Sequence, residues 1–374
     1  ADGPGLVGID AASKALTVTL RRLELRIDNA TYDHGCLDIR PSGANPINLT
    51  LENVILHNDG QNKGVWMRNS GTGAGGPTAP ITFTWNGGSL YTRLDEGMEL
   101  EVALNASTNP VHANYTLNID NVQFLCEDDH ILDWYLPMDD SNFTFTDCTF
   151  LVSNDATTIM RGNGWRGCNV EFNRCVLDNS AKPIYPVRLR GDLIAKPNNL
   201  VMKNCLIKGG DLLGSEYMVE TRATNAKFYF CTFWSPNEAR DTRACISASS
   251  SGGSSLGVVN CIFADCFKTP IAVAGAAMNY AIDANLFAHP AAGGELGTNS
   301  IVGSNPLFVS VPGDFHLQTG SLALEAGQNA AMALVGNVDL EGAARPNPAG
   351  SRPDLGCYER AGTVSSVADW ALFD

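Results

Sequence analysis

The chain has 374 residues, a formal net charge of −15 and an apolar fraction of 44%. That fraction is enough for a continuous core, and no apolar run reaches the roughly 20 residues of a transmembrane helix, so we expect no membrane span. The acidic balance argues against binding nucleic acid through its phosphates, so we expect no nucleic-acid partner.

The first 20 residues contain the alternating stretch Leu16–Leu20. This pattern predicts a short strand, and we expect residues 1–20 to cap the open sheet edge that begins at residue 21. The chain starts with Ala1 rather than Met, which fits a mature product left after removal of a signal peptide and also fits a trimmed chain. On the first interpretation the protein is secreted or displayed at the cell surface.

A short phrase repeats across residues 21–302. Its fullest copy, Phe143–Phe150, alternates apolar and polar residues and then reads Asp147-Cys148. The cysteine recurs at steps of 27, 30, 26 and 30 residues, and a period in this range indicates a repeat architecture. The five repeated cysteines are Cys148, Cys175, Cys205, Cys231 and Cys261.

Each copy predicts two strands joined by a tight bend. Alternation over about four residues is typical of a strand with one buried face. The residue before the cysteine position is often Asn or Asp, and both tolerate left-handed backbone. The examples are Asn53, Asn121, Asp147, Asn204 and Asn260. A coil of this kind cannot bury its inner face alone, so we expect stacked coils with the five cysteines in one internal column.

These features resemble the right-handed parallel β-helix of the pectate-lyase-like superfamily. The resemblance implies an all-β, single-stranded solenoid of roughly nine to eleven coils over residues 21–302. Residues 303–360 resemble the ending found on many secreted bacterial β-helix surface proteins, which implies a closing segment and an exported protein. The matching motifs are Asn305–Phe308, Asp314–Leu317, Gly320–Gly327, Asp339–Gly342, Arg345-Pro346 and Asp354–Glu359. The family form has Pro-Ala-Ile-Asp where this chain has Leu322–Glu325.

Six of the eleven cysteines lie outside the repeated position. We expect the column cysteines to be free buried thiols, and any disulfide to lie among the other six, whose pairing the sequence leaves open. These six are Cys36, Cys126, Cys168, Cys245, Cys266 and Cys357. Glycosylation of the sequons at Asn29, Asn48, Asn105, Asn114 and Asn142 also stays open.

A second strand in each coil carries outward charges. Alternation places Val187 and Leu189 inward, so Arg188 and Arg190 point out. Lyases of the resembling superfamily need a base and a cation near the substrate carboxylate. The catalytic candidates are therefore Arg190, Glu220, Arg222 and Arg243. The interpretation we favour is a ladder of ion pairs that stabilises the outer face.

The acidic stretch Glu127–Asp133 suggests a second kind of site. Its carboxylates could bind calcium, the only cofactor we consider, or hydrolyse a glycan. The metal candidates are Asp128, Asp129 and Asp133. A solvated acidic loop is the simpler interpretation. Sugar-binding candidates are Trp134, Arg161, Arg188 and Tyr217, although aromatic residues in this fold more often pack inside.

Residues 361–374 form an apolar tail with three candidates for an assembly contact, Trp370, Leu372 and Phe373. We expect self-association, and the leading functional prediction is an exported structural or adhesive protein that assembles end to end into filaments. One alternative is a polysaccharide lyase or glycoside hydrolase acting on an acidic polysaccharide. Another is a carbohydrate-binding, tailspike-like module without turnover. The sequence favours the non-enzymatic role and leaves catalysis open.

Overall fold

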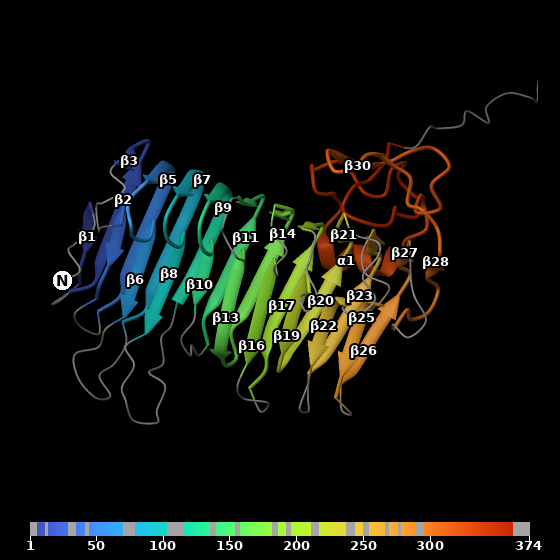
Figure 1. Ribbon diagram of the computed structural model, residues 1–374, viewed down its shortest axis with the longest axis horizontal. Coiled ribbons are helices and arrows are strands. Elements are labelled where there is room, and N and C mark those ends of the chain that lie inside the picture. Colours follow the sequence, from blue (N-terminus) through green and yellow to red (C-terminus); the bar gives the residue numbers. More distant parts are fainter. Residues whose placement is uncertain are drawn as a thin grey trace, which may run out of the picture.

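The computed structural model describes most of residues 6–361. The ranges outside the description are 1–5, 12–13, 29–34, 42–44, 70–78, 103–114, 135–139, 154–157, 182–185, 192–195, 211–216, 237–243, 250–253, 266–268, 276–277, 289–294 and 362–374. Within the described part, the chain is a parallel β-solenoid whose coils follow one another in sequence order from blue to orange (Figure 1). The predicted all-β solenoid is confirmed. No helix among the described residues is long and apolar enough to cross a membrane.

The first sheet takes one strand from each coil, and its ten strands run in chain order. They are β1 (Val7–Ile9), β4 (Leu37–Ile39), β6 (Val65–Asn69), β8 (Met98–Val102), β10 (Leu132–Trp134), β13 (Met160–Trp165), β16 (Val187–Gly191), β19 (Val219–Arg222), β22 (Ala244–Ser249) and β25 (Thr269–Ala274). Every pairing is parallel, so equivalent residues of successive coils are vertical neighbours.

The second row of strands forms another face of the solenoid. It consists of β2 (Leu16–Arg21), the first halves of β5 (Ile47–Asn58), β7 (Ile81–Thr92) and β9 (Tyr115–Cys126), then β11 (Asn142–Thr146), β14 (Asn169–Asn173), β17 (Asn198–Lys203), β20 (Thr224–Tyr229), β23 (Ser255–Val259) and β26 (Asn279–Asp283). Because β1 and β2 pair with β4 and β5, the segment expected to be a cap supplies strands of the first coil.

The third row follows directly after the bend. It consists of β3 (Glu24–Ile27), the second halves of β5, β7 and β9, then β12 (Thr149–Val152), β15 (Val176–Asn179), β18 (Leu206–Gly209), β21 (Thr232–Trp234), β24 (Ile262–Ala264), β27 (Leu286–Phe287) and β28 (Ile301–Val302). Short turns then carry the chain from the third row back to the first sheet.

The bend between the second and third rows is left-handed in every full coil. The predicted bend residues Asn53, Asn121, Asp147, Asn204 and Asn260 have φ of 52°, 53°, 52°, 50° and 59°. This confirms the expectation of a tight left-handed bend. Arg174 and Phe230 adopt the same φ, so the coil geometry imposes this backbone even on residues with no preference for it.

The interior is a single apolar core along the axis. Alternation sends every second residue inward, and the side chains of Trp85, Trp134 and Trp165 are completely enclosed. Phe145 and Phe172 of successive coils stack with ring centroids 4.9 Å apart. Vertical stacking of like residues thus makes the core continuous from coil to coil.

The five repeated cysteines lie in one buried column beside the bend. Each thiol donates a weak hydrogen bond to a backbone carbonyl of the preceding coil, for example Cys175 Sγ to Phe145 O at 3.4 Å and Cys205 Sγ to Phe172 O at 3.5 Å. Asn285 ends the column and makes the same contact through its amide, with Nδ2 2.9 Å from Val258 O. All ten described cysteines are buried free thiols, while Cys266 lies outside the described residues.

The C-terminal segment packs over the outside of the last coils, shown in red in Figure 1. Its elements are β29 (Phe308–Ser310), β30 (Asp314–Leu317), the 3₁₀ helix η1 (Asn329–Ala331) and α1 (Met332–Val335). Phe315 contacts Trp234 of the third row at 5.6 Å between ring centroids. Asn204 and Asn260 reach out from their bends to Val338 O and Gln328 O, both at 3.1 Å.

Candidate functional site

The outer face of the first sheet carries a charged row. Pairing register places one residue from each of seven successive coils in this row: Asp38, Trp66, Glu99, Asp133, Arg161, Arg188 and Glu220. Each occupies an outward position because the residues before and after it face the core. The row therefore brings together residues from coils that are far apart in sequence.

Ion pairs link neighbours within the charged row. Arg161 binds both carboxylate oxygens of Asp133, with Nε 2.9 Å from Oδ1. Glu220 receives Arg190 at 2.6 Å and Arg188 at 3.5 Å. The catalytic candidates Arg190 and Glu220 thus contact each other directly. Arg222 is the exposed register neighbour of Arg190, and Arg243 lies outside the described residues.

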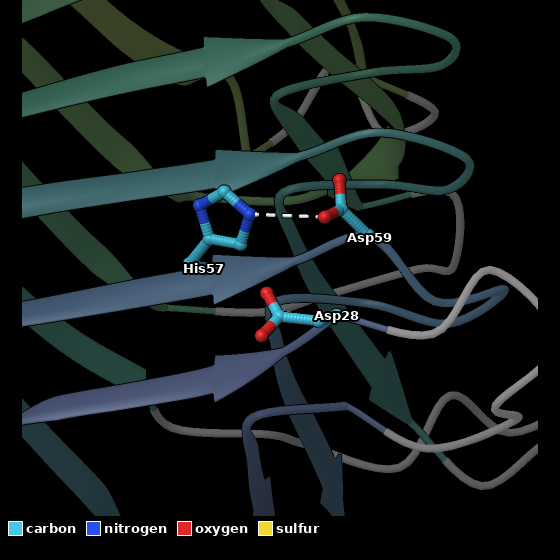
Figure 2. Close-up of side chains that lie close together, drawn as sticks. All are labelled: Asp28, His57 and Asp59. Carbon is cyan, nitrogen blue, oxygen red and sulfur yellow. Dashed lines mark hydrogen bonds and ion pairs between the residues drawn. The ribbon is translucent and has the colours of Figure 1, made fainter.

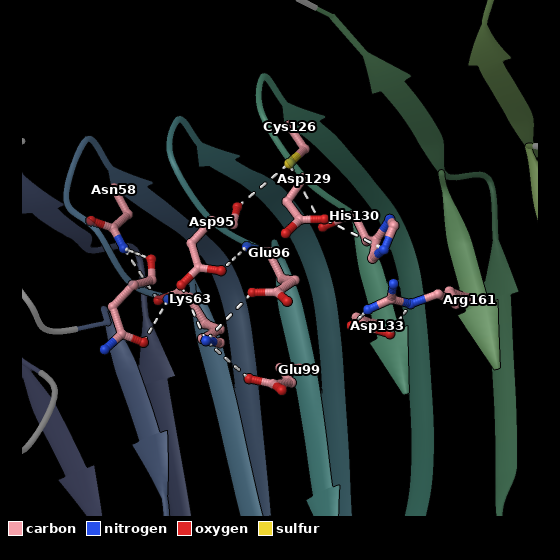
Figure 3. Close-up of polar contacts among 11 residues, drawn as sticks. Asn58, Lys63, Asp95, Glu96, Glu99, Cys126, Asp129, His130, Asp133 and Arg161 are labelled. Carbon is pink, nitrogen blue, oxygen red and sulfur yellow. Dashed lines mark hydrogen bonds and ion pairs between the residues drawn. The ribbon is translucent and has the colours of Figure 1, made fainter. Parts of the chain in front are cut away.

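A second group of charges lies where three stacked turns enter the first sheet. We call Lys63, Asp95, Glu96, Glu99 and Asp129 the acid cluster. Lys63 Nζ lies 3.1 Å from Asp95, 3.5 Å from Glu96 and 3.3 Å from Glu99 (Figure 3). Carboxylate oxygens of Asp95, Glu96 and Asp129 lie within 4.8 Å of one another. One ammonium group therefore faces several carboxylates.

Backbone contacts between the turns fix the acid cluster. Asn58 Oδ1 accepts a hydrogen bond from Gly60 N at 2.8 Å, and Asn58 Nδ2 donates to Lys63 O at 3.2 Å. Gly97 N donates to His130 O at 2.8 Å, which stacks the second turn on the third. A Cβ on Gly97 would lie 2.6 Å from Ile131 O, so only glycine allows this approach.

Burial controls the protonation of the acid cluster. Glu96 is only 8% exposed, and burial together with its hydrogen bond to Asp95 raises its pKa to about 9. Burial and then the charge of Asp95 also raise the pKa of Asp129. Burial alone would lower the pKa of Lys63, but Asp95, Glu96 and Glu99 outweigh it and raise that pKa. At neutral pH the cluster thus holds a neutral carboxylic acid beside a lysine cation.

His130 sits beside the acid cluster but does not titrate near neutrality. Burial, followed by the charges of Arg161 and Arg188, lowers its pKa to about 3. One ring nitrogen, Nδ1, shares a 2.8 Å hydrogen bond with the hydroxyl of Thr158. His130 is therefore a neutral imidazole that orders the third turn.

The metal candidates from the sequence fall in different surroundings. Asp129 belongs to the acid cluster, whereas Asp133 is held by Arg161 and Asp128 is exposed. The oxygen donors of Asp95, Glu96 and Asp129 are of the type that calcium prefers. Lys63 already neutralises part of this charge, so a cation there would compete with its ammonium group.

Another polar cluster lies near the N-terminal end of the third row. His57 Nε2 is 3.2 Å from Asp59 Oδ2, with Asp28 on the neighbouring coil (Figure 2). Asp28 also pairs with Arg26, and the ring of His57 stacks on Tyr91 with centroids 4.5 Å apart. These contacts occupy the groups of the cluster, and we assign it no function.

The aromatic candidates do not gather on one surface. Trp134 lies inside the core, where its ring stacks on Phe143 with centroids 4.4 Å apart. The cause is strand alternation, since Asp133 points outward and its neighbour must point inward. Tyr217 is half-buried just before β19. The aromatic residue on the outer face is instead Trp66, with Lys63 Nζ 5.1 Å from its ring centre.

The acid cluster was missed in the sequence because its members are separated by more than 30 residues. Lys63 and Asp95 follow the third-row halves of β5 and β7, so the common position after a strand end was the available signal. The tail candidates Trp370, Leu372 and Phe373 lie outside the described residues. No family model matches the sequence, and no curated protein is found similar to it.

Proposed function

We propose that this chain is an exported, surface-displayed β-solenoid with a structural or adhesive role. The supporting observation is the pairing within the charged row. Arg190 and Arg188 both bind Glu220, and Arg161 binds Asp133 in a two-pronged contact. The role expected of these residues in a lyase is thus replaced by cross-strand pairing along the outer face.

Chemistry supports this interpretation. An arginine stays protonated in proteins, so its use as a proton acceptor requires surroundings that favour the neutral form. A carboxylate at 2.6 Å favours the cation instead. Glu220 has its charge directed at two guanidinium groups rather than outward. The charged row therefore suits a rigid outer face better than proton abstraction from a sugar.

A turnover assay tests this proposal. The protein is incubated with alginate, pectate and chondroitin, with and without calcium, and the absorbance of the unsaturated product is followed. We expect no product from the wild type. Product formation that is lost in Arg190→Gln but kept in Arg21→Gln, an exposed arginine of β2, would overturn the scaffold role.

The acid cluster favours one alternative, a glycoside hydrolase. Glu96 keeps its proton at neutral pH and could protonate a leaving sugar, while Asp129 could serve as the carboxylate that completes the pair. Release of reducing ends from a neutral or acidic glycan, abolished by Glu96→Gln, would support this role. Equal rates in the two proteins would exclude it.

Self-association is part of the proposal. Among the described strands, β1 pairs only with β4, so its other edge is unpaired. Inward residues of the first coil such as Val18 and Leu20 are half-buried, unlike their fully buried equivalents in later coils. An open edge with apolar interior residues suits strand addition by another molecule. Light scattering over a concentration series tests this, and a monomer at every concentration would contradict it.

A further inference from the structure

Ten side chains on the outer face of the second row form a regular array. They come from the first five coils, through strands β2, β5, β7, β9 and β11. One column contains Thr17, Asn48, Thr82, Thr116 and Asn142, and the other contains Thr19, Thr50, Thr84, Asn118 and Thr144. Every position in this threonine–asparagine array is Thr or Asn.

The array is held in place by the core beneath it. The residue between the two columns points inward in each coil, and Leu49, Phe83 and Leu117 are at most 1% exposed. Pairing across the five strands continues without a register shift through both columns. Neighbouring members are therefore about 4.8 Å apart between coils and about 6.7 Å apart along a strand.

The array carries no charge, although the protein has a net charge of −15. Its first column continues as an amide ladder, in which Asn169 donates to Asn142 and Asn199 donates to Asn169, both at 2.7 Å. The second column ends at Glu171, which pairs with Lys203 at 2.9 Å. The two-column neutral surface thus has a defined boundary after the fifth coil.

The array faces outward and stays uncovered by the described residues. Thr17, Thr19, Asn48, Asn118 and Asn142 are exposed, and the other five members are half-buried between their neighbours. The C-terminal segment packs on the third row of later coils, through residues such as Trp234. The array is therefore open to a large partner.

We propose that the threonine–asparagine array binds the surface of a crystalline, neutral polysaccharide. The proposal deepens the adhesive role suggested above and rests on it. Each hydroxyl or amide both donates and accepts hydrogen bonds, as sugar hydroxyls do, and the absence of charge matches an uncharged glycan. A single contact of this kind is weak, but many contacts of fixed period add when the partner repeats as well. A crystalline surface provides that repeat, whereas a single soluble sugar does not.

Binding of the full chain to microcrystalline cellulose tests the proposal. The disrupted variant is Thr84→Lys with Thr116→Lys, which places two charges in adjacent coils of the array. The matched control is Gln123→Lys with Thr149→Lys, two exposed third-row residues in β9 and β12. We expect the wild type and the control to be retained equally, and the disrupted variant to bind about tenfold more weakly or worse.

Three outcomes would overturn this inference. The wild type would stay in solution, the two variants would be weakened equally, or the wild type would partition into growing ice but not onto cellulose. Circular dichroism of each variant separates loss of binding from loss of fold. Failure of cellulose binding leaves the scaffold role standing, because that role is tested by the turnover assay; turnover dependent on Arg190 would remove the scaffold role and leave array binding to be judged by the variants.

Discussion

Arg345 and Glu359 form an ion pair whose side chains have no exposed surface, with Nε 3.2 Å from Oε2. Arg345 Nη1 also donates to Gly356 O at 3.0 Å, and the guanidinium lies over the ring of Phe230 at 4.4 Å. These residues belong to two of the motifs that resemble a surface-protein ending. In this chain they attach the C-terminal segment to the bend of a solenoid coil.

Replacing Arg345 with Met should destabilise the C-terminal segment. The change leaves the carboxylate of Glu359 buried without its counter-charge, which typically costs about 3–5 kcal/mol. Chemical unfolding and limited proteolysis within residues 303–361 measure the effect. Adding Glu359→Gln should recover part of the loss, and Arg360→Met, an exposed side chain, serves as the control. A variant as stable as the wild type would contradict this role.

Stability should fall as pH rises from about 5 to 9 because of Glu96. Its pKa is raised from 4.5 to about 9 in the folded protein, so the folded state keeps a proton that the unfolded chain loses across this window. The unfolding free energy therefore decreases with rising pH. Glu96→Gln keeps a neutral side chain and should flatten the dependence. Identical pH profiles for the two proteins in denaturant unfolding would refute the assignment.

Asn121 tests the left-handed bend. Its φ is 53°, and its side chain is exposed. Asn121→Ala should cost about 1 kcal/mol, since a Cβ without a compensating polar group disfavours this conformation, while Asn121→Gly should be near neutral. Denaturant midpoints of the two variants give the comparison. Equal midpoints for Ala and Gly would show that the bend places no demand on the residue.

The column cysteines should resist thiol reagents in the folded protein. All ten described cysteines are buried, and burial followed by neighbouring thiols raises the pKa of Cys175 and Cys231. Reaction needs both access and a thiolate. Titration with a disulfide reagent should therefore detect at most about one fast thiol in native buffer and all eleven in guanidinium under reducing pretreatment. Fast reaction of several thiols before unfolding would contradict the buried column.

The sequence was sufficient to predict the solenoid because its repeat is local. Alternation around Phe143 and Phe145, followed by Asp147, specifies strand and bend within a few residues. The bend prediction succeeded at Asn53 and Asn260 because Asn has an intrinsic tolerance for left-handed backbone. The inward position of Trp134 also follows from alternation once Asp133 is placed outward.

The acid cluster could not be predicted in the same way. Whether Lys63 meets Glu96 depends on how closely consecutive turns stack, and that depends on Gly64 and Gly97 approaching the next coil. The length of each loop also decides which residues reach the same level. Such contacts arise only after the coils have stacked, so no local pattern contains them.

The uniform bend has a consequence for how this protein can evolve. Asn142 and Asn169 are register partners one coil apart, and both Asn142 and Thr116 begin strands of the same row. Deleting residues 142–168 would bring Asn169 to the level of Asn142 with strand, bend and column still aligned. The molecule can therefore be shortened or extended by duplication in steps of one coil, which makes its reach from a cell a heritable length rather than a fixed property of the fold.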